Sequence, residues 1–457
     1  QTCALPICGS WYYIIAGLFF IATAILLRKL SGTALIVYAA LVLGTVVWGL
    51  WEVGSDFFAL APRLDILGVF GLWLLIPAVT RGFDAKGAKI ALSGTLAITI
   101  AVMAYSIFND PQEINGTITN QQPAKAQAVS GVAESDWPAY GRTQGGVRYS
   151  PLTQINDKTV KNLQVAWTFR TGDLKTGNDS GETTNQVTPI KVGDNMYICT
   201  THQKLVALDP TTGQAKWTFD PKLKADKTFQ HLTCRGVSYF DASNTAGFET
   251  SLAAKKTTSA ECPQKIILPV NDGRLVAINA ETGKACTDFG KNGEVDLQKD
   301  MPFPYPGGYI PTSPPVITGT TIIIAGSTTD NYSTEEPSGV IRGYDVNTGE
   351  LLWVFDTGAE DPNAIPAPGQ KYVQNSPNAW APLAYDAKLD IVYVPTGVGT
   401  PDIWGGNRTE LHERYANSML AINATTGKKI ATFTQICDML KGLLPVSAIL
   451  LLQKNKT

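Results

Sequence analysis

A short turn sequence recurs four times in this chain and sets the strongest limit on its fold. The copies read ALDPTTGQAKW (207–217), AINAETGKACT (277–287), GYDVNTGELLW (343–353) and AINATTGKKIA (421–431). In each copy an apolar strand runs into an Asx-x-x-Thr-Gly segment. The Asx side chain can hydrogen-bond its own turn and the glycine can adopt a positive φ, so each copy predicts a hairpin.

The spacing of these hairpins predicts a repeated architecture. The turn glycines Gly213, Gly283, Gly349 and Gly427 are 70, 66 and 78 residues apart, which leaves room for four strands and their loops in each unit. In the first and third copies a tryptophan stands four residues after the glycine, where it can pack on a neighbouring unit; the fourth copy has Ala431 there. Sheets that each bury a face on the next form a propeller or a solenoid. A set of unrelated hairpins would need no such spacing.

The N-terminal part predicts a transmembrane α-helical bundle. Apolar runs occupy residues 10–27, 33–51, 64–80 and 89–108. Each is close to the ~20 residues that a helix needs to cross the hydrocarbon core. Buried core helices are the alternative, but the runs carry almost no internal charge and have Trp or Tyr near several ends, as membrane spans do.

Basic residues predict the orientation of these helices. Arg28 and Lys29 follow the first run, Arg81 and Lys86 lie between the third and the fourth, and Lys89 begins the fourth. Because basic loops stay on the cytoplasmic side, the chain after about residue 109 is expected in the periplasm of a bacterial inner membrane.

The remaining segments divide the chain further. Residues 1–9 lack both an initiator Met and a basic signal-peptide region, and are interpreted as an artefact. Residues 109–135 are polar and rich in Ala, Pro, Gly and Ser, which is typical of a linker. Residues 136–433 have the short β-branched runs of an all-β domain. A net charge of −2 argues against nucleic-acid binding, which requires a concentrated basic surface.

Four cysteines fall in the β-rich part: Cys199, Cys234, Cys262 and Cys286. None of them has CxxC spacing, so they do not indicate a zinc site. In an extracytoplasmic domain Cys234–Cys262 is one possible disulfide, although the pairing is open at this stage.

Two segments resemble a known family. SDWPAYGRTQGGVRYSPLTQIN (135–156) and LQVAWTFRTGD (163–173) are similar to the opening of the pyrroloquinoline quinone (PQQ)-dependent dehydrogenases. The repeated turn is similar to their propeller signature. The membrane leader narrows the resemblance to the membrane-bound glucose dehydrogenase branch, which includes quinate-type enzymes. The resemblance implies an eight-bladed propeller, about half of it present here, that oxidises an aldose (D-glucose to gluconolactone) with PQQ and passes electrons to ubiquinone.

The chain departs from that family at both ends. Four membrane helices are expected here, whereas the branch usually has five. After about residue 433 the amino-acid sequence no longer resembles the family, and residues 434–457 are interpreted as an aberrant tail. The family's catalytic aspartate lies in that region, so no catalytic residue is assigned. Asp402 is not taken as the base, and the 457-residue polypeptide is expected to be inactive.

The resemblance also implies a metal and cofactor site. Asp330 and Asn331 correspond to residues at the metal and PQQ, and their oxygens suit Ca²⁺ or Mg²⁺. An Asx turn at the end of a strand is the alternative. Trp380 resembles the tryptophan that stacks on the flat PQQ; a core tryptophan is the alternative.

Three further residues complete the predicted site. Arg235 is expected to bind a PQQ carboxylate, Thr312 to contact a carboxylate through its hydroxyl, and His231 to lie over the PQQ face opposite Trp380. The other histidines, His202 and His412, are interpreted as surface or turn residues.

Two other functions remain open. The same fold could serve a quinate or polyol dehydrogenase. A non-catalytic, membrane-tethered propeller would share the repeat but would need neither the Asp-Asn pair nor the stacking tryptophan.

Overall fold

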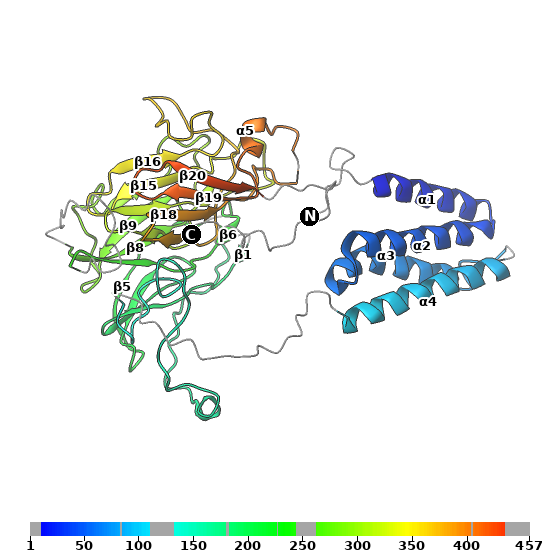
Figure 1. Cartoon of the computed structure of the whole chain (residues 1–457), viewed down its shortest axis with the longest axis horizontal. Helices are drawn as coiled ribbons and strands as arrows, with labels where there is room; N and C mark the ends of the chain where they lie inside the picture. Colours follow the sequence, from blue (N-terminus) through cyan, green and yellow to red (C-terminus); the bar gives the residue numbers. More distant parts are fainter. Residues whose placement is uncertain are drawn as a thin grey trace, which may run out of the picture. The chain divides into compact units, whose positions relative to one another are not determined.

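The computed structural model describes residues 11–82, 85–109, 132–179, 182–225, 227–243, 262–403 and 405–434. These form a helical unit (residues 11–109) and a β unit (residues 132–434) (Figure 1). The predicted artefact at residues 1–9, nearly all of the predicted linker and almost the whole C-terminal tail lie outside the described residues.

The helical unit contains four helices. They are α1 (Trp11–Arg28), α2 (Thr33–Val53), α3 (Phe57–Leu75) and α4 (Lys86–Phe108) (Figure 1). Among the described residues, α2, α3 and α4 are long and apolar enough to cross a membrane, and the apolar stretch Tyr12–Arg28 of α1 is shorter. Their outward side chains are also apolar: Val69 is 66% exposed and Ile90 is 68% exposed. A helix that is apolar all round is typical of a membrane span.

The third helix differs from its predicted bounds of 64–80. It begins at Phe57, seven residues earlier, because the Asp56 side chain accepts a hydrogen bond from the Ala59 backbone N–H and caps the first turn. It ends at Leu75 because Pro77 cannot continue a helix. The hydropathy pattern did not predict the first turns of α3, because the charged Arg63 interrupts the apolar run. In the structure the Arg63 guanidinium pairs with Glu52 of α2 at 2.9 Å.

The β unit contains four antiparallel four-stranded sheets, which are visible as stacked ribbons in Figure 1. In chain order they are β2 (Ile190–Val192), β3 (Asn195–Cys199), β4 (Leu205–Leu208), β5 (Ala215–Phe219); β7 (Ser238–Asp241), β8 (Gln264–Val270), β9 (Arg274–Asn279), β10 (Glu294–Asp296); β12 (Val316–Ile317), β13 (Thr321–Ile324), β15 (Ile341–Asp345), β16 (Leu351–Phe355); and β17 (Ala384–Asp386), β18 (Ile391–Pro395), β19 (Ser418–Asn423), β20 (Lys429–Thr434).

Shorter elements lie before the first sheet, between sheets and within the loops of the third and fourth sheets. Strands β1 (Glu182–Thr183) and β6 (His231–Leu232) form a parallel pair, and β11 (Tyr309–Ile310) pairs with β14 (Ser327–Thr328). A 3-10 turn, η2 (Val160–Asn162), precedes the first sheet, and a short helix, α5 (Glu410–Glu413), precedes β19.

The sheets are stacked face to face. Each neighbouring pair shares one buried apolar cluster, with Ile266 of the second sheet against Tyr197 of the first, and Ile322 of the third sheet against Leu275 of the second. The fourth sheet packs on the third in the same way. Burial of one sheet on the next is the packing that a propeller requires, so the predicted fold class is confirmed.

The repeated turns have the predicted geometry. The four turn glycines have φ between +69° and +72°, and the backbone N–H of each donates to the backbone carbonyl of the Asx residue at 2.8 to 3.0 Å. The Asx side chains accept backbone N–H bonds from their own turns, as in Thr211 and Thr212 donating to Asp209 at 2.8 Å. A glycine is required here because other residues rarely adopt this φ.

Tryptophans dock on these glycines from the preceding sheet. A Cβ built on Gly283 would lie 2.6 Å from the ring of Trp217, and one on Gly427 would lie 2.6 Å from the ring of Trp353. Trp167, in the segment before the first sheet, lies against Gly213 with the same geometry. The predicted packing between units is therefore confirmed. A Thr stands at the tryptophan position of the second copy, and the turn of the third copy is contacted instead by residues 289–295.

The cysteines do not pair as Cys234–Cys262. The disulfides are Cys199–Cys234 and Cys262–Cys286, with Cα–Cα distances of 6.1 and 5.8 Å. The first joins the end of β3 to the segment after β6, and the second joins the start of β8 to the turn after β9. Stacking of the first two sheets decides the first pair, and the pairing of β8 with β9 within the second sheet decides the other.

Candidate functional site

A pocket of about 320 Å³ collects most of the predicted site residues. Its walls come from five separate chain segments, 182–186, 230–235, 312, 327–330 and 378–380. Five of the six predicted residues line it, namely His231, Arg235, Thr312, Asp330 and Trp380. The sixth, Asn331, follows Asp330 in the chain and is not among the lining residues.

His231 is held at the rim by a strand pair that the sequence did not reveal. Its strand, β6, pairs in parallel with β1, which places Glu182 opposite His231. The imidazole Nδ1 lies 3.2 Å from the Glu182 carboxylate, and both side chains remain partly exposed. The histidine ring therefore has a carboxylate partner that fixes its orientation.

Arg235, Thr312 and Trp380 form a connected group on one wall. The Arg235 guanidinium donates to the Thr312 hydroxyl and, at 3.4 Å, to the Trp380 carbonyl. It also lies 5.3 Å from the centre of the Trp380 ring, which is a cation–π distance. Burial lowers the pKa of Arg235 from its ordinary value. An arginine desolvated beside an open cavity, with no described carboxylate in ion-pair contact, is suited to bind an anionic ligand.

Trp380 differs from the tryptophans between the sheets. Half of its surface, 50%, is exposed, whereas only 5% of Trp353 is exposed. Its ring therefore offers a free aromatic face to the pocket, which the core alternative would not.

Asp330 and Asn331 are joined to a distant loop by their side chains. The Asp402 backbone N–H donates to Asp330 Oδ1 at 2.9 Å, and Asn331 Nδ2 donates to Asp402 Oδ1 at 2.8 Å. Burial raises the pKa of the Asp330 carboxyl, and the charge of Asp402 also raises it. Two adjacent carboxylates and an amide oxygen offer the hard oxygen ligands that Ca²⁺ and Mg²⁺ prefer.

Several pocket residues were not predicted as site residues. They are Glu182, Thr184, Gln186, Gln230, Thr233, Ser327, Thr328 and Asn378. Gln230 precedes His231 in the sequence, but nothing in the sequence indicated that its side chain contacts the backbone of Asp330, one hundred residues away. Segment 182–186 carries no motif, and only the β1–β6 pairing brings it to the pocket.

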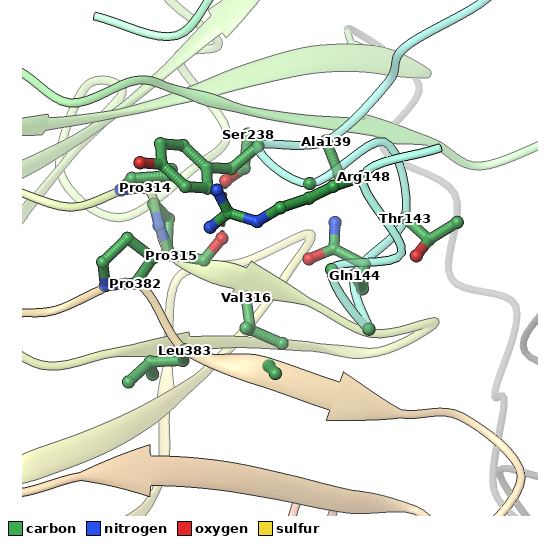
Figure 2. Close-up of a pocket in the computed structure, with 15 residues that line it drawn as sticks. Ala139, Thr143, Gln144, Arg148, Ser238, Pro314, Pro315, Val316, Pro382 and Leu383 are labelled. Carbon is green, nitrogen blue, oxygen red and sulfur yellow. Dashed lines mark hydrogen bonds between the residues drawn. The ribbon is translucent and has the colours of Figure 1, made fainter. Parts of the chain in front are cut away.

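A second pocket, of about 180 Å³, lies among the same chain segments (Figure 2). Ser238, Pro314 and Pro382 line it, and they follow Arg235, Thr312 and Trp380 by two or three residues. Its other wall is segment 139–148, whose Arg148 side chain extends across the pocket toward Ser238 and Pro314 in Figure 2.

This segment, 139–148, contacts an edge strand of the third sheet and an edge strand of the fourth. The Tyr385 backbone N–H donates to the Gln144 carbonyl at 2.8 Å, and the Ile317 backbone N–H donates to the Gln144 side chain at 3.4 Å. The segment thus connects β12 to β17 next to the chain stretches that line the larger pocket.

The two histidines left as surface or turn residues are more enclosed than expected. His202 lies between two carboxylates, with Nδ1 2.7 Å from Asp173 and Nε2 3.2 Å from Asp179. His412 is 6% exposed and completes a capping box with Thr409. The assignment of His202 to a turn is confirmed, because it lies in the turn between β3 and β4. The assignment of His412 to the surface or a turn is wrong, because it is buried within α5.

The Asp173–His202–Asp179 cluster predicts an acid-dependent contribution to stability. Burial alone would raise the pKa of both carboxyls, but hydrogen bonds and the His202 charge lower each pKa below its ordinary value. A carboxyl whose pKa is lowered by folding stabilises the fold at pH values above about 3.8, its pKa in the unfolded chain. This stabilisation is lost as the pH falls through the lower pKa of the folded state. Asp173→Asn should cost about 1–3 kcal/mol at pH 7.

The loss of unfolding free energy caused by Asp173→Asn should become smaller below pH 4. Urea unfolding of the wild type and the variant between pH 7 and pH 3 measures it. Glu350→Gln, which changes an exposed carboxylate, is the control and should show little difference at any pH. A destabilisation by Asp173→Asn that stays constant with pH would contradict the stabilising role of the ionised Asp173 carboxylate.

Comparison with known proteins identifies the family. Residues 137–437 match the PQQ family model described as "Glucose/ethanol/alcohol dehydrogenase, beta-propeller domain". The chain therefore belongs to this family of PQQ-dependent dehydrogenases.

Three relatives show which members of the family this chain is similar to. The chain is 73% identical to quinoprotein glucose dehydrogenase A of Acinetobacter calcoaceticus over 93% of its length and 53% of the relative's. It is 59% identical to quinoprotein glucose dehydrogenase of Escherichia coli (strain K12), covering 90% of this chain and 51% of the relative. It is 36% identical to quinate/shikimate dehydrogenase (quinone) of Acinetobacter baylyi, covering 92% and 52%. The chain spans about half the length of these relatives.

The larger pocket fits PQQ chemically. PQQ is flat and carries three carboxylates, and the pocket offers an exposed indole face together with an arginine and several hydroxyl and amide donors. The Asn378 side-chain oxygen and the Thr233 hydroxyl are buried there without a hydrogen-bond partner among the described residues. Unpaired buried polar atoms are costly, so a polar ligand in this pocket would relieve that cost.

Proposed function

We propose that the gene product containing this chain is a membrane-anchored quinoprotein dehydrogenase that oxidises an aldose, D-glucose to gluconolactone. The observation that carries the proposal is the single pocket that gathers His231, Arg235, Thr312, Asp330 and Trp380 from four separate segments. The similarity to two glucose dehydrogenases favours an aldose as the substrate class.

Each of these residues has a distinct proposed role toward the cofactor. Arg235 and Thr312 bind carboxylates of PQQ, and the Trp380 ring supports its flat face. His231, oriented by Glu182, covers the opposite face. When bound, PQQ supplies the electrophilic quinone that accepts two electrons from the sugar.

Asp330 and Asn331 are proposed to hold the divalent cation. Their oxygen atoms suit Ca²⁺ or Mg²⁺, whose charge would polarise the quinone. We assign no proton acceptor among the described residues, because the Asp402 carboxylate accepts from Asn331 and its backbone N–H donates to the Asp330 carboxylate.

The membrane location and the electron acceptor are part of the same proposal. Arg28 ends α1 and Lys29 follows it. Arg81 lies between α3 and α4, and Lys86 begins α4. These basic residues favour a cytoplasmic position for both loops and a periplasmic β unit. Ubiquinone in the bilayer is the proposed electron acceptor.

A quinate or other polyol substrate is the second candidate, and the 36% identity to a quinate/shikimate dehydrogenase supports it. The lower identity makes it the weaker candidate. A non-catalytic propeller is disfavoured because it has no need for a half-exposed tryptophan beside a desolvated arginine.

Substrate oxidation by membranes decides among these functions. Membranes from cells that express the gene should be reconstituted with PQQ and Mg²⁺ or Ca²⁺, and supplied with glucose or quinate and a ubiquinone analogue. Glucose-dependent reduction of the quinone is expected, and Arg235→Ala should raise the half-saturating PQQ concentration about 100-fold, as two charge-assisted hydrogen bonds are lost. Quinate-only reduction would support the second candidate, and no reduction with either substrate would support the non-catalytic one.

A further inference from the structure

The loop that carries Asp330 and Asn331 is held at three points. It spans residues 329–336 and follows β14. Its side chains Asn331 to Glu335 are exposed, whereas Glu336 is completely buried. Exposed loops usually lack a fixed conformation, so the contacts beneath this loop determine where Asp330 and Asn331 lie.

Gln230 makes the first contact. Its side-chain Nε2 donates to the Asp330 carbonyl at 3.1 Å, and its Oε1 accepts from the Asp330 backbone N–H at 2.9 Å. One amide therefore satisfies both backbone groups of Asp330. Gln230 is itself fixed, because its carbonyl accepts from the Glu182 backbone N–H at 3.0 Å. The same short segment thus presents His231 to one side of the pocket and holds Asp330 on another.

Glu336 makes the second contact from below the loop. Its carboxylate accepts from the Ser333 backbone N–H at 3.0 Å and from the Tyr305 hydroxyl at 3.0 Å. The Tyr305 hydroxyl also lies 2.6 Å from the Thr329 hydroxyl, so both ends of the loop meet one buried carboxylate. No Lys, Arg or His of the described residues forms an ion pair with Glu336. A buried carboxylate held only by neutral donors is costly, and its contacts here serve to fix the loop.

Asp402 makes the third contact through the side chains themselves. Asn331 has a φ of +60°, a left-handed conformation that orients its amide toward Asp402. This contact fixes the orientation of the Asn331 side chain relative to Asp330.

We propose that Gln230 and Glu336 are positioning residues that hold Asp330 and Asn331 ready for the divalent cation. The inference rests on the proposed function, since that function assigns a cation to this pair. A loop that is already ordered spares cation binding the entropic cost of fixing each of its residues. Without these anchors, cation binding would bear that cost.

Backbone hydrogen exchange tests the preformed loop without any ligand. In the cation-free and PQQ-free gene product, peptides covering residues 329–336 should exchange at least tenfold faster in Gln230→Met and Glu336→Met than in the wild type. Glu336→Gln keeps an acceptor for the Ser333 N–H and should stay close to the wild type. Unchanged exchange in both methionine variants would overturn the positioning role.

Cation binding tests the consequence. The thermal shift caused by MgCl₂ or CaCl₂ should require about tenfold more cation in Glu336→Met and Gln230→Met than in the wild type. The control is Glu335→Met, which removes a neighbouring carboxylate from the exposed side of the same loop and should change the requirement less than twofold. Equal weakening in Glu335→Met would show that loop charge matters rather than position, and would overturn the proposal.

The two ideas fail in different ways. A wild-type protein that shows no shift with either cation would remove the cation from the proposed function, and with it the purpose of the anchors. A normal wild-type response with unaltered methionine variants would overturn only the positioning role. If Glu336→Met does not fold, Gln230→Met gives the same readouts from a residue at the pocket edge.

Discussion

Trp380→Ala is expected to weaken PQQ binding about 30- to 100-fold and to leave the stability of the fold almost unchanged. The ring presents a half-exposed face to the pocket and lies 5.3 Å from the Arg235 guanidinium. Stacking with a flat ligand contributes about 0.5–1.5 kcal/mol beyond buried area, and the buried area adds about 25 cal/mol per Å². A total of about 2–3 kcal/mol corresponds to the stated factor.

The measurement is a titration of the cofactor-free protein with PQQ, followed by quenching of intrinsic fluorescence. Trp380→Phe keeps an aromatic face and serves as the matched control, with an expected loss below about tenfold. If Trp380→Ala binds PQQ as the wild type does, the ring is not the support for the cofactor, and the pocket assignment loses its main aromatic contact.

Trp353→Ala is expected to have the opposite profile, with a loss of about 3–5 kcal/mol in unfolding free energy. Trp353 is 5% exposed, packs on Gly427 of the next sheet, and donates from Nε1 to the Ala424 carbonyl at 3.0 Å. Alanine would leave a cavity between the third and fourth sheets and an unpaired carbonyl. Close packing explains why such a cavity is costly.

Urea unfolding followed by circular dichroism measures this effect. Trp353→Phe should cost less, because it fills most of the volume and loses mainly the hydrogen bond. Trp380→Ala serves as the second control, since it removes an equally large side chain from an exposed position. A Trp353→Ala protein that loses less than about 1 kcal/mol would mean that the tryptophans do not join the sheets.

The local features of this fold could be predicted from sequence because short-range physics produces them. The Asx-x-x-Thr-Gly turns depend on a side chain and a glycine within five residues of each other, and all four formed as expected. The apolar runs gave helices for the same reason. The start of α3 was misplaced because Arg63 interrupted the hydropathy pattern, while its partner Glu52 lies on another helix.

The site could be predicted only in part. Resemblance to a family located the six cofactor and metal residues, and the structure places five of them on one pocket. The resemblance could not identify Glu182 as a site residue, because its position depends on a parallel strand pair between segments 49 residues apart. It could not pair the cysteines either, because stacked sheets bring Cys199 to Cys234.

The sequence by itself therefore determined the hairpin units, the apolar helices and the types of residue available for a cofactor site, since each follows from neighbours along the chain. Only the tertiary structure decided which segments meet: the stacking of the sheets, the disulfide partners, the enclosure of His202, and the anchoring of Asp330 by Gln230 and Glu336. These contacts join residues that are distant in sequence, and they form only when burial of apolar faces brings the sheets together.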